Sequence, residues 1–140
     1  MLVYLIGSLR NPKVPEIANE IRASGYDVFE DWYAAGPTAD DCLLAYEKAR
    51  GHSTAQALKG YAAQHIFEFD KYHLARADAA VLVLPAGKSG HLELGWFLGG
   101  GKPGYILLDE EPPRIDLMYQ FATGVFSTME ELIGALDGGH

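Results

Sequence analysis

The stretch 79–103 constrains the fold of this chain most, because it joins an apolar strand to a helix through a short loop of small residues. A continuous apolar run, Ala80 to Leu84, ends at a proline and is followed by a Gly/Lys/Ser loop, residues 87–90. A helix expected from about Gly90 to Leu98 then carries a single carboxylate, Glu93, among apolar neighbours. Open α/β sheets build ligand sites at such strand–loop–helix junctions. Because backbone N–H groups and the helix dipole favour negative charge there, we expect a carboxylate in the first turn to stay ionised, ready to act as nucleophile or base.

Short apolar strands alternate with helical patterns along the rest of the chain. The expected strands are 3–6, 26–29, 80–84, 105–108 and 125–126. The first expected helix begins near residue 14, and further helices are expected over about 41–50, 54–76, 90–98 and 114–121. A last helix is expected after a Ser127–Glu130 capping box, and residues 31–41 are expected to form a loop. This alternation predicts one α/β domain over 1–137, with 138–140 as a frayed tail.

The expected architecture is a flavodoxin/Rossmann-like three-layer sandwich, a five-stranded parallel sheet with helices on both faces. We expect the strand order 2-1-3-4-5, in which the ligand crevice lies where strands 1 and 3 diverge. That order would bring together three loops, 7–12, 30–38 and 85–93, each with polar residues that a turn alone does not require.

Composition excludes several classes of function. The 140 residues carry a net charge of −8, which argues against binding nucleic-acid polymers but not against binding a mononucleotide. No apolar run approaches the roughly 20 residues that span a bilayer, so no membrane partner is expected. The single cysteine, Cys42, excludes an internal disulfide and favours a reducing cytoplasm.

Two partial motifs do not hold. Gly87-Lys88-Ser89 is like the end of a phosphate-binding P-loop, but Leu82 stands where that motif needs its first glycine. His91-Leu92-Glu93 is like the H-x-E of zinc deaminases, but no cysteine follows Cys42 to complete the metal site.

Three ordered pieces carry a family resemblance. They are the segment Tyr4–Arg10 (YLIGSLR), then Asp70 with 77–79, then 90–95 (GHLELG) leading to 101–103 (GKP). The set resembles the nucleoside 2-deoxyribosyltransferase family, including its relatives that hydrolyse the N-glycosidic bond of nucleoside monophosphates. The resemblance implies the same doubly wound fold, no metal or organic cofactor, and a homodimer or larger homo-oligomer. The segment 40–60 has no counterpart in the family and is expected to shape substrate choice.

The resemblance gives catalytic roles to two carboxylates. Glu93 would attack the anomeric carbon of the sugar and form a covalent glycosyl-enzyme, as in retaining glycoside hydrolysis. Its alternative role is a glutamate that only complements the helix dipole, worth ~0.3–1 kcal/mol. Asp70 would hydrogen-bond a sugar hydroxyl or relay a proton to the departing base. Its alternative is an ion pair with Lys71 or Arg76, while Asp78 is expected only to precede the third strand.

Two loops are candidates for substrate binding. In the first, Gly7 allows close backbone approach, Ser8 offers a hydroxyl and Arg10 offers a charged fork for a 5′-phosphate; a solvated Arg10 is the alternative. The second loop would add Lys88, Ser89 and Gly90 to the substrate-binding set. Trp32, after the second strand, would either stack on a nucleobase or cover the edge of the core.

These observations predict an N-glycosidase that acts on a (deoxy)nucleoside 5′-monophosphate. If a second base resolved the glycosyl intermediate in place of water, the enzyme would be a transferase. A nucleotide-binding or sensing module of the same fold without turnover is the alternative, although the presence of Glu93 counts against it. A generic flavodoxin-like protein is disfavoured, because the chain has no recognisable flavin or dinucleotide phosphate loop.

Overall fold

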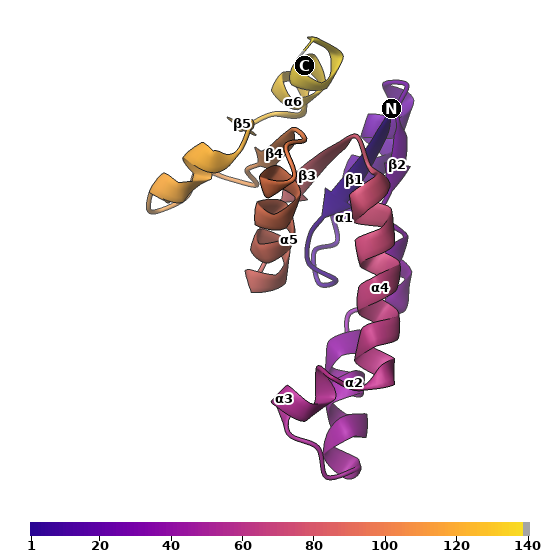
Figure 1. Cartoon of the computed structure of the whole chain (residues 1–140). Coiled ribbons are helices and arrows are strands. Elements are labelled where there is room, and N and C mark those ends of the chain that lie inside the picture. The colour runs from indigo at the N-terminus through magenta and orange to yellow at the C-terminus, as the bar shows by residue number, and fades with distance from the viewer. Residues whose placement is uncertain (139–140) are drawn as a thin grey trace.

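A computed structural model of the chain describes residues 1–138, and its centre is a five-stranded parallel sheet (Figure 1). The strands are β1 (Leu2–Ile6), β2 (Asp27–Phe29), β3 (Ala79–Val83), β4 (Gly104–Leu107) and β5 (Gly124–Phe126). Every neighbouring pair is parallel, and the spatial order is β2-β1-β3-β4-β5. The predicted fold class and strand order are therefore confirmed.

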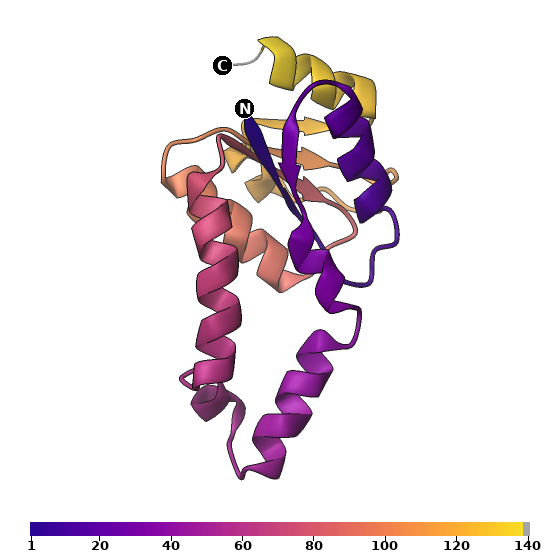
Figure 2. The ribbon, with the colours of Figure 1, turned by 90° about the vertical axis from the view of Figure 1, so that its right-hand side faces the viewer.

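Helices cover both faces of the sheet. One face carries α1 (Val14–Ala23) and α6 (Met129–Gly138), and the other carries α4 (Tyr61–Arg76) and α5 (Lys88–Gly99) (Figure 2). Successive strand residues point to opposite faces, so Leu5 joins the core under α1 while Tyr4 joins the core under α4 and α5. Because both faces are covered, β3 is buried at every residue, which is why its sequence is a continuous apolar run.

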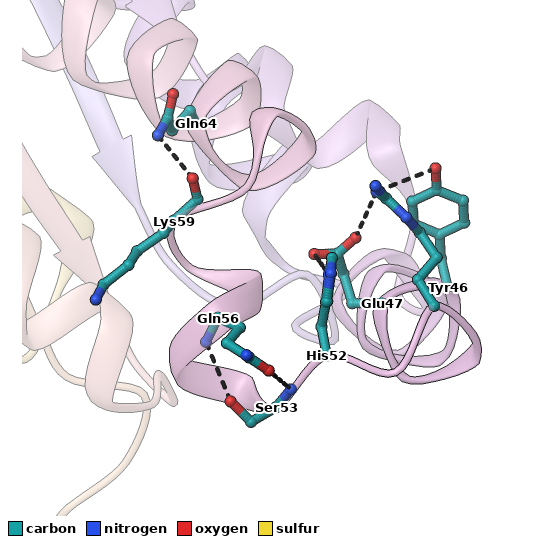
Figure 3. Close-up of polar contacts among 8 residues, drawn as sticks. Tyr46, Glu47, His52, Ser53, Gln56, Lys59 and Gln64 are labelled. Carbon is teal, nitrogen blue, oxygen red and sulfur yellow. Dashed lines mark hydrogen bonds and ion pairs between the residues drawn. The ribbon is translucent and has the colours of Figure 1, made fainter.

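A helical extension projects beyond the carboxyl edge of the sheet. It consists of α2 (Ala39–Ala49), α3 (Thr54–Ala57) and the first half of α4, and Figure 2 shows α2 and α4 running down from the sheet to meet at α3. Glu47, a residue that is only 1% exposed, stabilises the part of this extension where α2 leads into α3. It accepts from Arg50 Nη1 at 3.2 Å and lies 3.3 Å from His52 Nδ1 (Figure 3). These contacts tie α2 to the loop that leads into α3.

Several boundaries differ from those expected for local reasons. Residues 31–35 form a 3₁₀ helix, η1, and α2 begins at Ala39, so 31–41 is only partly a loop. The expected helix 54–76 is broken, because a Ser53–Gln56 capping box starts α3 and a second helix, α4, follows Gly60.

The C-terminal part also departs from expectation. A short 3₁₀ helix, η2 (Leu117–Phe121), replaces the expected 114–121 helix, because the Asp116 carboxylate accepts the Met118 N–H at 3.0 Å and begins the turn there. The last helix is capped by Thr128, not Ser127, since Thr128 Oγ1 accepts the Glu131 N–H at 3.2 Å. The predicted tail begins inside this helix, which runs to Gly138, and 139–140 lie outside the described residues. Within 1–138, no helix is both long and apolar enough to cross a membrane.

Candidate active site

Three side chains from three elements meet on the face of the sheet that α4 and α5 cover. Tyr4 comes from the middle of β1, Asp70 from α4 and Glu93 from α5. The Tyr4 hydroxyl lies within hydrogen-bonding range of the Glu93 carboxylate, and the charge of Asp70 acts on both groups. The two carboxylates that the sequence singled out are therefore brought together across 23 residues of chain, with a buried phenol beside them.

The environment of Glu93 differs from the one expected. Helix α5 begins at Lys88, not Gly90, so Glu93 lies in its second turn, beyond the N–H groups that would hold a carboxylate ionised. Burial, with a smaller contribution from the charge of Asp70, raises the pKa of Glu93 to about 7, and the hydrogen bond from Tyr4 opposes this rise. Burial thus favours the protonated form of this carboxyl group, so the expectation that the helix start keeps it ionised was wrong.

Tyr4 is a site residue to which the sequence analysis gave no role. Its side chain is only 1% exposed, and burial together with the charges of Glu93 and Asp70 strongly raises its pKa. The phenol therefore keeps its proton and can donate it in a hydrogen bond to the ionised Glu93. A signal was present in the sequence, since a lone tyrosine with a hydroxyl stands among aliphatic residues in a buried strand.

Asp70 is half-buried and free to meet a ligand. Burial and the charge of Asp40 raise its pKa. The alternative ion pairs are not formed: Arg76 Nε donates to His73 Nδ1 at 2.9 Å, and Lys71 Nζ lies 5.8 Å from the centre of the Phe67 ring. In the described part of the chain no ion pair reaches Asp70. Asp78 does what was expected of it, accepting the Leu2 N–H at 2.8 Å beside the strands.

The first candidate binding loop, which follows β1, is held by contacts with other parts of the chain. Arg10 Nη2 pairs with the Asp41 carboxylate at 2.8 Å and its Nε donates to Pro37 O at 3.4 Å, while Ser8 Oγ accepts the Arg10 N–H at 3.1 Å. Arg10 is exposed, and its pairing joins the β1 loop to the start of α2. The solvated alternative is thus only partly right, since the guanidinium has a partner that a phosphate would have to displace.

Trp32 is anchored to the sheet. Its indole N–H donates to Leu5 O at 2.8 Å, and the ring packs beside Gly7, where an added Cβ would stand 3.6 Å from it. Half-buried against both sides of the core, Trp32 covers the core edge, which favours the structural alternative over base stacking. The contact also shows that the loops after β1 and β2 meet, as the predicted strand order required.

The second candidate loop divides between exposed and packed residues. Lys88 and Ser89 are exposed in the first turn of α5, whose N-terminus has no side-chain cap. Gly90 is buried, and a Cβ there would stand 3.0 Å from Leu82 Cδ1 and 3.2 Å from Ile6 Cγ2. Its small size is therefore explained by close packing of α5 on the sheet.

Within 1–138, no three His, Cys, Asp or Glu side chains form a group that could hold a metal ion.

A groove lies on the opposite side of α5 from the carboxylates. It has a volume of about 920 Å³, runs between α5 and η2, and contains none of Tyr4, Asp70 and Glu93. His91 lines this groove, with Nε2 2.9 Å from the Tyr119 hydroxyl and Nδ1 2.8 Å from Gly87 O. The carboxylate cluster, rather than this groove, is the candidate active site, because buried titratable groups act on one another there.

The raised pKa of Glu93 makes a prediction about stability. The folded chain holds this proton up to about pH 7, whereas an unfolded glutamate releases it near 4.5, so the free energy of unfolding falls as pH rises through that window. At pH 8 the ionised Glu93 therefore costs about 3 kcal/mol. We expect Glu93→Gln to raise the free energy of unfolding at pH 8 and to change it little at pH 4. Urea unfolding at the two pH values checks this, and an equal effect at both would contradict it.

Solved structures share the fold of this chain. Neither a protein-family profile nor a curated protein sequence matches the chain. A 2-deoxyribosyltransferase from Bacillus psychrosaccharolyticus superimposes with a TM-score of 0.63 at 17% identity, covering 95% of this chain and 90% of that one. The CMP N-glycosidase BcmB of Clostridium botulinum superimposes with a TM-score of 0.54 at 15% identity, covering 98% and 99%. The resemblance expected from the ordered motifs is thus confirmed at the level of the fold, which this chain shares with a deoxyribosyltransferase and an N-glycosidase.

Proposed function

We propose that this protein cleaves the base–sugar bond of a (deoxy)nucleoside 5′-monophosphate, with Glu93 as the nucleophile. The observation that carries the proposal is the half-buried carboxylate of Glu93, on which the Tyr4 phenol acts through a hydrogen bond and the Asp70 carboxylate through its charge. Two enzymes of similar fold act on related compounds, as a 2-deoxyribosyltransferase and as a CMP N-glycosidase. A carboxylate nucleophile is also the group that retaining glycosidases use at an anomeric carbon.

The proposed reaction has two steps. A Glu93 oxygen attacks the anomeric carbon, and the bond to the base nitrogen breaks with its electron pair leaving on the base. Asp70, an anion in the free enzyme, relays a proton from a water molecule to the departing base. The hydroxide formed from that water then attacks the same carbon, and Glu93 is released as a carboxylate. If a second base attacked instead, the product would be a new nucleoside and the enzyme a transferase.

Tyr4 has a separate task in this scheme. Its hydrogen bond stabilises Glu93 as an anion and so lowers a pKa that burial would otherwise raise further. The hydrogen bond also fixes the direction of the carboxylate, leaving its other oxygen to face the sugar. The buried phenol cannot itself be the base, because its pKa is strongly raised.

Phosphate binding is assigned to residues at the carboxyl edge of the sheet, the half-buried Ser8 and the exposed Arg10, Lys88 and Ser89. Arg10 would exchange its Asp41 partner for the phosphate, which is feasible because both side chains of that pair are well exposed. Lys88 adds a second positive charge at the uncapped start of α5.

We further propose that the enzyme works in the cytoplasm as a homodimer or larger homo-oligomer. Helix α4 supports the oligomer, because apolar side chains point out of it on several sides and only Leu74 is fully buried. The exposed ones are Tyr61, Ile66, Phe67, Phe69 and Tyr72. Apolar side chains that lie exposed together on one helix are normally covered by other protein.

Chromatographic detection of free base tests the proposal directly. The purified protein is incubated with each ribo- and deoxyribonucleoside 5′-monophosphate and with the matching nucleosides. We expect base release from at least one monophosphate and slower release from its nucleoside. Thermal stabilisation by a nucleotide without release of base would overturn the proposal in favour of a binding or sensing module.

A further inference from the structure

Lys102 bridges the chain after α5 to the end of α4. Its ammonium group donates to Ala75 O and Ala77 O, both at 2.7 Å, and lies 5.7 Å from the centre of the Phe97 ring. Helix α4 ends at Arg76, so these carbonyls belong to its last turn and C-cap, where backbone acceptors lack helical partners and the dipole favours a cation. The contact is thus a helix cap supplied from 25 residues further along the chain.

This bridge joins the two helices that carry the candidate catalytic carboxylates. Asp70 lies on α4 and Glu93 on α5, and both helices pack on the same face of the sheet (Figure 2). Across residues 1–138, the two Lys102 bonds are the side-chain hydrogen bonds that connect α4 to the α5–β4 segment; the remaining side-chain bonds of α4 stay within it or reach the preceding turn.

The end of α4 that Lys102 holds determines the direction of the whole helix. The first half of α4 projects past the sheet, so only the last turns, with Leu74 and Ala77 in the core, are fixed by packing. Asp70 lies roughly 9 Å along the helix axis from Arg76. A small tilt at the capped end therefore displaces the Asp70 carboxylate relative to Glu93.

We propose that Lys102 is a positioning residue that sets the separation between Asp70 and Glu93 by fastening the end of α4 to the α5–β4 junction. The expected change in kcat/KM rests on the proposed function, whereas the claim that Lys102 sets the position of α4 does not. If the cap is lost, α4 moves away from α5 and water enters between the two carboxyl groups. Less burial and weaker repulsion from Asp70 both act to stabilise the Glu93 anion.

The experiment compares Lys102→Met, which keeps the apolar stem over Phe97 but removes the donors, with Lys102→Arg, which keeps them. Lys59→Met makes the same chemical change at an exposed lysine of the extension and serves as the control. The pKa of Glu93 is measured by NMR titration of ¹³C-labelled carboxyl groups, assigned with Glu93→Gln. We expect a lower pKa in Lys102→Met and wild-type values in the other two. In the assay, kcat/KM should fall about tenfold in Lys102→Met and recover in Lys102→Arg.

Repeating the Lys102→Met substitution in an Asp70→Asn protein distinguishes positioning of Asp70 from a general effect on the stability of the fold. If Lys102 acts by placing Asp70, adding Lys102→Met to Asp70→Asn should lower kcat/KM much less than in wild type. A Lys102→Met protein that is less stable but keeps the wild-type pKa of Glu93 would overturn the proposal. If that variant does not fold, Lys102→Gln is titrated instead, under the same criterion. Should no base release be found at all, the titration still decides the role of Lys102 while the proposed function fails.

Discussion

Replacing Glu93 with glutamine is expected to reduce base release by roughly 10⁴-fold or more, the scale seen when a catalytic nucleophile is removed. A neutral amide of similar size cannot form the glycosyl ester, although it can still pack in the same crevice and accept the Tyr4 hydrogen bond. Free base is measured by chromatography with the substrate that wild type cleaves best. Intact-mass spectrometry of quenched wild-type reactions should also show the protein carrying one sugar phosphate, and the variant should show none.

Glu20→Gln is the matched control, since it makes the same change at an exposed glutamate of α1, on the opposite face of the sheet. It should retain the wild-type rate. Asp70→Asn should lose an intermediate factor, about 10²- to 10⁴-fold, because it removes acid–base assistance but leaves the nucleophile. A folded Glu93→Gln protein that releases base at the wild-type rate would show that the nucleophile is elsewhere.

The fold could be predicted because its determinants are local. Each buried strand is a short apolar run, and each is followed by a helical pattern, so the parallel sheet follows from the connections between strands. The strand order rested on how often such sheets adopt it, and the structure agrees. Helix ends were less predictable, because neighbouring residues compete for the same backbone groups. Thr128 outcompeted Ser127 as the cap of the last helix, and Lys88 rather than Gly90 begins α5.

The two candidate carboxylates could be predicted from the sequence, but the environment around them could not. Glu93 and Asp70 stood out in ordered motifs, whereas the pairing of Glu93 with Tyr4 joins residues that only the folded sheet brings together. Burial is likewise a property of the packed helices, so the direction of the pKa shift at Glu93 was missed. The Arg10–Asp41 pair depends on where the helical extension lies, and no pattern near Arg10 indicates it.

The pH dependence of the reaction should report that environment. A nucleophilic carboxylate must be ionised, and the pKa of Glu93 is about 7, so kcat/KM should be constant above neutral pH and fall about tenfold per pH unit below it. Tyr4→Phe removes a hydrogen bond that lowers the pKa of Glu93, and should move the acid limb to higher pH. Asp70→Asn removes a charge that raises this pKa, and should move the limb to lower pH.

The opposite displacements make this profile a demanding test of the arrangement of the three groups. Each variant changes one neighbour of Glu93. A general loss of stability would move the acid limb in the same direction in both variants, or in neither. Profiles of kcat/KM from about pH 4 to 9, measured under pseudo-first-order conditions, locate each limb. An acid limb near the ordinary glutamate value of 4.5 would mean that water reaches the ionised Glu93 in the working enzyme. A limb near 7 that moves up in Tyr4→Phe and down in Asp70→Asn would show that these two side chains set the ionisation of the nucleophile from opposite directions.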